Sequence, residues 1–80
     1  MIIQQLLLMI SKKQIAQSVG KELRRQRTKK KLSQEELAHK AGLYRTYIGH
    51  IEVGRYMPSV YTIYKISQAL KVKSSDLLLY

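Results

Sequence analysis

The sequence lacks cysteine, has a single proline, and carries only five acidic residues among 80. Without cysteine it can form no disulfide, no thiolate metal site and no cysteine nucleophile, which fits a reducing compartment. Other catalytic side chains are scarce: His39 and His50 are the only histidines, Asp76 is the only aspartate, and there is no glycine-rich phosphate loop. Since no nucleophile is paired with a base, we expect no enzyme, no metal site, no cofactor and no small-molecule substrate.

The sequence also has no long apolar run, because its first ten residues, MIIQQLLLMI, fall short of the about 20 that cross a bilayer. A secretory signal would begin with basic residues, whereas here Lys12 and Lys13 follow the run. We interpret residues 1–14 as an apolar N-terminal extension that packs against the domain at 15–80 or a second subunit. Met9 as the natural start and membrane binding by this segment remain open, and we expect a cytoplasmic protein.

Positive charge dominates what is present: 15 Lys and Arg give a net charge of +10. Such a chain attracts polyanions, namely DNA, RNA or an anionic membrane, although basic residues can also serve solubility alone. Between residues 21 and 31 there is one acid and a cluster of basic residues, Lys21, Arg24, Arg25, Arg27, Lys29, Lys30 and Lys31.

Hydrophobic periodicity predicts helices throughout, and no segment shows the alternation and turn residues of a hairpin. Ser11 and Gln14 resemble a capping box, and apolar residues four apart from Ile15 to Leu23 predict a helix that ends near Lys30. The first helix is therefore amphipathic with a basic last turn, which suits the negative end of a helix dipole.

Two short helices follow. Ser33 is a strong N-cap and Glu36 completes a second capping box, while Gly42 ends this second helix. A third helix runs from about Tyr44 to Val53. Two short helices joined by a glycine-containing turn are the helix-turn-helix layout.

A fourth helix is predicted to start at Pro58–Ser59. Its expected buried stripe comprises Val60, Ile63, Ile66 and Leu70. Ser74 or Ser75 is expected to cap a short last helix that holds residues 77–79. The chain is thus predicted to be all-α, with five helices.

Residues 19–78 resemble the phage-repressor and Cro-like, or Xre-like, helix-turn-helix family. The resemblance lies in three sequence segments that occur in the same order as in the family, LSQEELA, AGLYRTYIGHIEVG and PS. It implies a five-helix lambda-repressor-like domain and a transcriptional regulator that binds double-stranded DNA. The segment RTYIGHIE, followed by an almost immediate C-terminus, also resembles the controller proteins of restriction-modification systems, which are short homodimers. A prophage-type repressor, or an antitoxin whose main partner is another protein, remains the alternative.

The third helix carries the candidate base-reading residues. If Ile48 and Ile51 face the core, then Arg45, Thr46 and His50 face outward, and the family's base-reading positions fall on them. Arg45 can donate two hydrogen bonds to guanine, Thr46 can offer a methyl or hydroxyl group, and His50 can donate to a base or phosphate. The alternative is that Arg45 only binds phosphate.

The phosphate-binding candidates are Gln34, Tyr47, Arg55, Tyr56 and Lys31. Gln34 lies where backbone N–H groups of the second helix attract an anion, and the family places a phosphate contact there. Arg55, with the backbone of Tyr56, follows the third helix and is expected to hold the flanking phosphate. The Tyr47 hydroxyl either donates to a phosphate or only packs, and Gln34 could instead be a solvated surface residue.

The resemblance further implies a partly buried ion pair between Arg27 and Glu52, which assigns Arg27 to structure. The sequence departs from the family at Gln26, Lys31, Tyr44 and Val53. Lys31 replaces a glycine and is strained if its backbone is left-handed, and Tyr44 replaces the usual N-cap of the third helix. Gln26 replaces a leucine, so it either opens a polar gap or faces the extension.

One recognition helix reads too few base pairs for a genomic address. A homodimer on a palindromic operator solves this, with half-sites about 34–36 Å apart. The candidate interface consists of surplus apolar and aromatic residues, Tyr61, Tyr64, Leu78, Leu79 and Tyr80, with Ile2, Ile3 and Leu6 as further candidates. Alternatively, the leucines complete the core.

Overall fold

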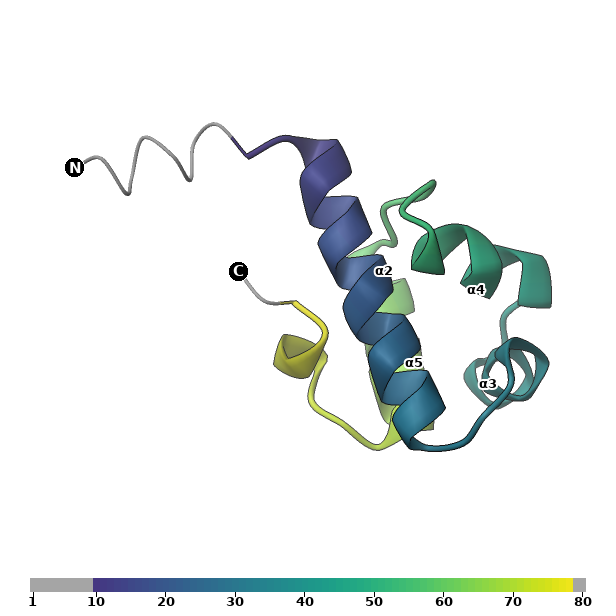
Figure 1. Ribbon diagram of the computed structural model, residues 1–80. Helices are drawn as coiled ribbons and strands as arrows, with labels where there is room; N and C mark the ends of the chain where they lie inside the picture. Colours follow the sequence, from purple (N-terminus) through teal and green to yellow (C-terminus); the bar gives the residue numbers. More distant parts are fainter. Residues whose placement is uncertain (1–9, 79–80) are drawn as a thin grey trace.

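The computed structural model describes residues 10–78 as a bundle of helices (Figure 1). The elements in this range are α2 (Lys12–Lys29), α3 (Gln34–Ala41), α4 (Arg45–Glu52), α5 (Val60–Leu70) and the 3-10 helix η1 (Ser74–Asp76). No strand occurs between residues 10 and 78, which agrees with the predicted all-α class. Residues 1–9, Leu79 and Tyr80 lie outside the described range. Because α2 starts at Lys12, it includes the last residues of the segment interpreted as an extension, and the division at residue 15 stays a prediction.

The prediction of five helices is wrong, because the described residues form four α-helices and one 3-10 turn. The Ser74 hydroxyl, expected to cap a last helix, lies 3.1 Å from the Ser67 hydroxyl of α5. The backbone N–H of Lys73 instead donates to the Asp76 carboxylate at 2.9 Å, which closes a single tight turn. Leu77 then enters the core with no exposed surface.

Local capping sets the starts of α2 and α3, as predicted. The Ser11 hydroxyl accepts from the backbone N–H of Gln14 at 3.1 Å, and the Gln14 side chain accepts from the backbone N–H of Ser11 at 2.8 Å. Ser33 and Glu36 form the same reciprocal pair at the start of α3. Gly42, with φ of 67°, ends α3 in the left-handed conformation. These predictions are confirmed because each depends on residues within one turn.

Two departures from the family have the expected local effect. Lys31 adopts φ of 60° in the turn between α2 and α3, a conformation that strains a residue with a Cβ atom. Tyr44 precedes α4 without a side-chain hydrogen bond to cap it. The helix α4 therefore starts without the stabilisation that a Ser or Thr N-cap supplies.

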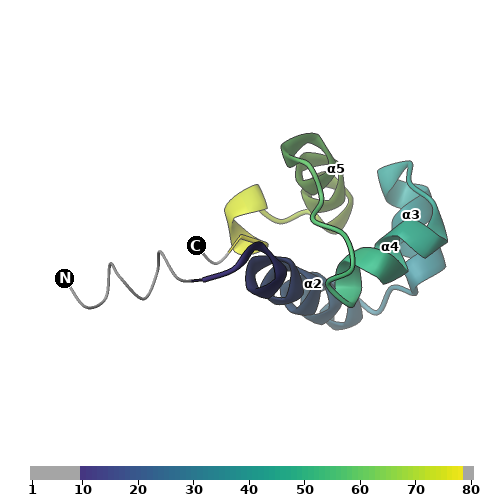
Figure 2. The same ribbon diagram turned by 90° about the horizontal axis from the view of Figure 1, so that it is seen from above.

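The core forms where α2, α3, α4 and α5 meet, with α3 and α4 on one side of α2 and η1 on the other (Figures 1 and 2). Its largest fully buried apolar side chains are Val19, Leu23, Leu37, Ile48, Ile51, Ile66, Leu70 and Leu77. The expectation that Val60 is buried is wrong, since it is 85% exposed. Val60 is the first residue of α5 and lies beyond the core, whereas Thr62 and Ser67 are buried instead.

Within the described chain, no helix has both the length and the apolar character required to cross a membrane.

Candidate nucleic-acid interface

The helices α3 and α4 form the helix-turn-helix, and the turn between them is held by backbone bonds. The N–H of Leu43 donates to the carbonyl of Ala38 at 2.8 Å, so the chain leaves α3 in a fixed direction. Ile48 and Ile51 of α4 are fully buried. The opposite side of α4 is consequently turned away from the core.

Three candidate base-reading residues lie on that outer side. Arg45 and Thr46, in the first turn, are exposed, and His50, one turn later, is half-buried. Gly49 lies between them, and a Cβ atom built there would have Gln34 Oε1 of α3, at 3.7 Å, as its nearest neighbour from another helix. The outer side of α4 therefore presents the polar side chains of Arg45 and Thr46 at its start. At Gly49 no side chain projects from the helix.

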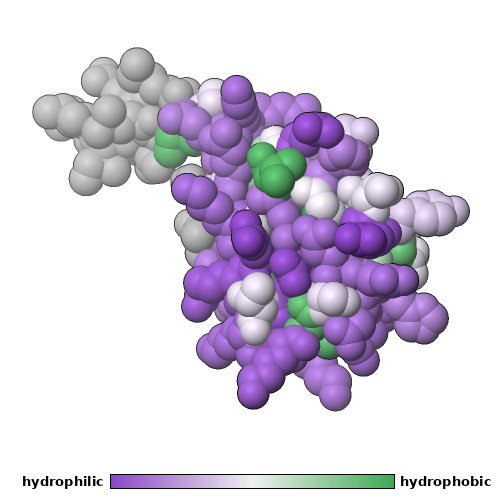
Figure 3. Space-filling model, turned by 45° about the vertical axis from the view of Figure 1, so that its right-hand side comes forward, coloured by the Kyte–Doolittle hydropathy of each residue, from purple (hydrophilic) through white to green (hydrophobic). Residues whose placement is uncertain are grey.

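The surface on this side of the molecule is mostly hydrophilic, with small separate apolar patches (Figure 3). Lys31, a phosphate-binding candidate, is exposed in the turn that leads into α3. Arg55 lines a hollow together with Lys12, Lys13 and Met57, next to the start of α2. Periodicity does not connect Lys12 and Lys13 with Arg55, because more than 40 residues separate them along the chain.

Four of the predicted DNA-contacting residues form one cluster, which we call the His50 cluster: Tyr47, His50, Arg55 and Tyr56. The backbone N–H groups of Arg55 and Tyr56 donate to the carbonyl of His50 at 2.9 and 3.4 Å. Arg55 Nη1 lies 3.1 Å from His50 Nδ1. The ring of Tyr56 lies 4.8 Å from that of His50 and 5.9 Å from that of Tyr47, centroid to centroid. Sequence reasoning named all four residues but not their mutual contact.

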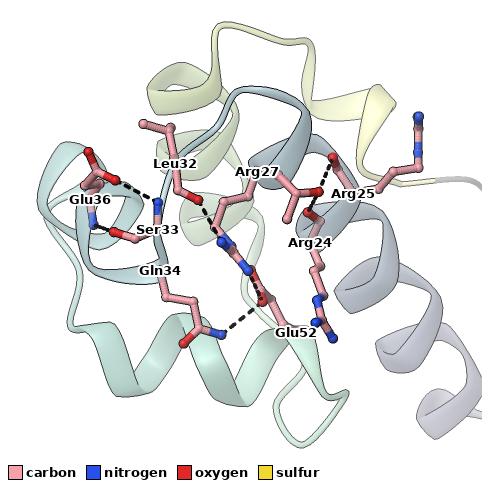
Figure 4. A network of polar contacts seen from close by, with 9 residues as sticks. Arg24, Arg25, Arg27, Leu32, Ser33, Gln34, Glu36 and Glu52 are labelled. Atoms are coloured by element: carbon pink, nitrogen blue, oxygen red, sulfur yellow. Dashed lines mark hydrogen bonds and ion pairs between the residues drawn. The ribbon is translucent and has the colours of Figure 1, made fainter.

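A second polar network joins α2, α3 and α4 (Figure 4). Arg27 Nε donates to Glu52 Oε2 at 2.6 Å, and Arg27 Nη1 donates to the carbonyl of Leu32 at 2.7 Å. The side chains of Arg27 and Glu52 are only 11% and 3% exposed, so the ion pair implied by the resemblance is present and shielded. Gln34 Nε2 adds a bond to Glu52 Oε1 at 3.0 Å.

Because of this last contact, Gln34 is not a freely solvated surface residue. It is half-buried, and its side chain is hydrogen-bonded to Glu52 of α4. One amide proton is used inside the protein, and a phosphate would be bound by the second amide proton and the N-terminal backbone of α3. No spacing along the chain signals the contact with Glu52, which lies 18 residues away. The phosphate contact of Gln34 stays a prediction.

A third network explains Gln26, the polar residue found where the family has leucine. Gln26 is buried, and its Nε2 donates to Glu22 Oε2 at 3.0 Å. Arg25 Nη2 donates to the same oxygen at 2.6 Å. The hydrogen bond from Arg25 is the main reason why the pKa of Glu22 lies below its ordinary value of 4.5, with burial acting in the opposite direction. Gln26 therefore leaves no unsatisfied polar gap.

The predicted dimer surface is only partly within the described chain. Tyr61 and Tyr64 of α5 are 69% and 52% exposed. Leu78, which follows η1, is 40% exposed. Leu77, in contrast, is buried and completes the core. Lys65 Nζ lies 5.2 Å from the centroid of the Tyr61 ring. The other candidate interface residues, including Leu79, Tyr80, Ile2, Ile3 and Leu6, lie outside the described residues.

Comparison with known proteins decides the family. A family model described as helix-turn-helix matches residues 23–77, which include α3, the turn and α4. The chain belongs to the helix-turn-helix family. Because this is a family of DNA-binding transcriptional regulators, the expectation that the protein is not an enzyme is confirmed.

Individual relatives agree with this membership. The control protein C.BamHI of Bacillus amyloliquefaciens is 49% identical over 51 residues, which are 64% of this chain and 63% of that protein. The immunity repressor protein of Bacillus phage phi105 is 40% identical over 58 residues, 72% of this chain but 40% of the repressor. The structure of the restriction-modification controller protein C.AhdI from Aeromonas hydrophila superimposes with a TM-score of 0.76 at 40% identity, covering 78% of this chain and 94% of that one. The predicted resemblance is thereby confirmed.

Proposed function

We propose that this protein is a sequence-specific regulator of transcription that binds a palindromic operator in double-stranded DNA as a homodimer. The outer side of α4 enters the major groove, with Arg45, Thr46 and His50 toward the bases. The observation that carries the proposal is the division of α4 into a fully buried inner side, Ile48 and Ile51, and an outer side on which Arg45 and Thr46 are exposed. A rigid helix with polar residues facing outward is what major-groove readout requires.

Electrostatics supports the same assignment. A net charge of +10 attracts the phosphate backbone. Lys31 precedes α3 and Arg55 follows α4, so they flank the helix-turn-helix at its two ends. Contacts there would set the register of α4 on the duplex, while the side chains of α4 read sequence.

The dimer is supported by the exposed aromatic residues of α5. Tyr61 is 69% exposed and Tyr64 is 52% exposed, although Ile63 of the same helix is buried. Aromatic residues are enriched at protein interfaces and give a two-fold dimer its buried contact. A dimer also supplies the second recognition helix that a palindromic site requires.

Within the family we favour a restriction-modification controller, because the likeness to C.AhdI covers 94% of that chain. The phage immunity repressor is the relative that favours the prophage-type alternative, and an antitoxin whose main partner is another protein is the third candidate. The neighbouring gene discriminates between them: an endonuclease, a phage gene or a toxin.

Selection of bound sequences from random duplexes tests the proposal. The wild-type protein is expected to enrich a two-fold symmetric site with half-sites about 34–36 Å apart. Arg45→Ala should lose base preference at one position of each half-site, whereas Lys31→Ala should weaken binding to all sequences alike. Failure to enrich any duplex sequence would contradict the proposal.

Salt dependence provides a second measurement. If about six phosphates are neutralised, the logarithm of affinity should fall with the logarithm of salt concentration with a slope near −5, at about 0.9 per phosphate. Lys31→Ala should reduce the slope by about one. An affinity independent of salt would exclude the phosphate contacts.

A further inference from the structure

The contact between Arg55 and His50 has a definite hydrogen-bond polarity. Arg55 Nη1 and His50 Nδ1 are 3.1 Å apart. A guanidinium group has only donors and stays protonated, so the nitrogen of His50 that it meets must accept. In the neutral ring of His50 the single proton then resides on Nε2.

Backbone and ring contacts hold the two side chains in this relation. The N–H groups of Arg55 and Tyr56 both donate to the carbonyl of His50, at 2.9 and 3.4 Å. The loop that ends α4 is therefore fastened to the same residue whose ring Arg55 contacts. The ring of Tyr56, 4.8 Å from that of His50, restricts the orientation of the imidazole further.

We propose that Arg55 is a positioning residue that fixes the tautomer of His50, so that His50 presents Nε2–H to the base edges as a donor only. This inference rests on the proposed function, because it concerns the hydrogen bond that one of the proposed base-reading residues, His50, makes to DNA. A donor suits the major-groove acceptors guanine O6 and N7, adenine N7 and thymine O4. Cytosine shows only its N4 amino donor there and is rejected.

Arg55 also links backbone binding to base reading. A guanidinium group carries five N–H donors, and the contact with His50 uses one. The remaining donors of Arg55, which is exposed, are free to bind a phosphate at the same time. The phosphate contact and the base contact then belong to one chain of hydrogen bonds that runs through His50 Nδ1.

Without Arg55 the other tautomer becomes available. With the proton on Nδ1, the Nε2 atom of His50 is an acceptor and can accept a hydrogen bond from the N4 amino group of cytosine or the N6 amino group of adenine. Loss of Arg55 is thus expected to change which base is tolerated opposite His50. Loss of a cation that binds phosphate only would weaken binding without this change.

The tautomer can be measured directly by long-range ¹H–¹⁵N NMR of the imidazole rings in the full chain. Spectra are recorded at rising pH until the histidine shifts no longer change, so that the neutral form is observed. In the wild type we expect the Nδ1 resonance of His50 at the unprotonated limit, whereas Arg55→Met moves it toward that of His39, which is exposed on α3. A protonated Nδ1 in wild-type His50, or a ring unaffected by Arg55→Met, would overturn the proposal.

Base preference is the functional readout, with Lys31→Met as the matched loss of another predicted phosphate-binding cation. In sequence selection, wild type and Lys31→Met should disfavour cytosine opposite His50 by about fivefold to tenfold, and Arg55→Met by less than about threefold. Identical preferences in Arg55→Met and Lys31→Met would reject the role of Arg55. If wild type selects no duplex at all, the proposed function fails, while the NMR result still decides the tautomer.

Discussion

Single atoms decide how closely α2 and α4 pack. A Cβ atom built on Gly20 of α2 would lie 2.2 Å from the carbonyl oxygen of Ile51 and 2.7 Å from that of Glu52. At Gly49 of α4, the nearest neighbouring atom would be 3.7 Å away. Both glycines are in helices, yet only Gly20 is required by the approach of another backbone. Gly20 therefore sets the position of the C-terminal end of the proposed recognition helix.

Replacing each glycine by alanine should change stability in opposite directions. Gly20→Ala forces backbone atoms apart and is expected to lower the free energy of unfolding by about 1–3 kcal/mol. Gly49→Ala is expected to raise it by about 0.5–1 kcal/mol, because alanine favours the helix and meets no close atom. Urea unfolding of both variants provides the measurement, and each variant is the control for the other.

The same pair tests whether Gly49 serves close approach to DNA. Reduced operator affinity of the more stable Gly49→Ala protein would show that the duplex needs the space of the missing side chain. Equal destabilisation of the two variants would contradict the packing described for Gly20.

Protonation of Glu22 is expected to weaken the fold in acid. The pKa of Glu22 is lowered in the folded protein, mainly by the hydrogen bond from Arg25. Its contribution to stability is therefore present above the ordinary pKa of 4.5 and is lost as pH falls through the lowered value. Glu22→Gln should be less stable than wild type near neutrality, and the gap should narrow between about pH 5 and pH 3.

Thermal unfolding as a function of pH measures this effect. Glu35→Gln, which changes an exposed glutamate in the first turn of α3, is the matched control and should keep the acid dependence of the wild type. A gap between wild type and Glu22→Gln that stays constant down to pH 3 would argue against the bond with Arg25 as the cause.

At the scale of elements, the buried charges of α2 and α4 hold the helix-turn-helix to the rest of the domain. The Glu52 carboxylate of α4 accepts hydrogen bonds from Arg27 of α2 and from Gln34 of α3. Each short helix of the motif has only eight residues, too few for independent stability. Their mutual orientation thus depends on contacts of this kind and on the buried isoleucines.

Breaking the ion pair on one side should be costly. Arg27→Met leaves the Glu52 carboxylate buried with Gln34 as its remaining partner, and we expect a loss of about 3–5 kcal/mol in the free energy of unfolding. Arg27→Met combined with Glu52→Leu should lose less than Arg27→Met alone, because no buried charge remains.

A double-mutant cycle in urea measures the coupling, with Arg24→Met, an exposed arginine of the same helix, as the control for loss of a surface cation. Strictly additive losses would mean that Arg27 and Glu52 do not interact in solution.

At the scale of the whole molecule, two aromatic side chains of α5 stay exposed in the described part of the fold. Tyr61 and Tyr64 lie on a different helix from the proposed reading surface. A second subunit could therefore bind α5 and leave α4 accessible to DNA. This separation of surfaces is what a two-fold dimer on two half-sites needs.

The combined change of Tyr61→Ser and Tyr64→Ser should weaken dimerisation by at least about tenfold, because interface aromatics contribute more than 1 kcal/mol when they are central. Sedimentation equilibrium measures the effect. Tyr44→Ser is the control, since Tyr44 is 83% exposed but lies at the start of α4. A wild-type protein that is monomeric at micromolar concentration would exclude the dimer.

Features that depend on neighbours along the chain can be predicted from the order of the amino acids alone. The capping boxes of Ser11 and Ser33, the end of α3 at Gly42 and the inward side of α4 all follow from spacings of three or four residues. Such spacings predict the helix-turn-helix and its outward residues, because a helix fixes which side chains share a side.

Which side chains meet across separate elements depends on how the helices pack. The exposure of Val60, the turn that buries Leu77, the bond from Gln34 to Glu52 and the contact of Arg55 with His50 have no signature in periodicity. Each depends on distances between separate segments of the chain, which the packing of α2 against α4 and of α5 against α3 sets. Periodicity places a residue on one side of its own helix, and the packed neighbours determine which group its side chain meets.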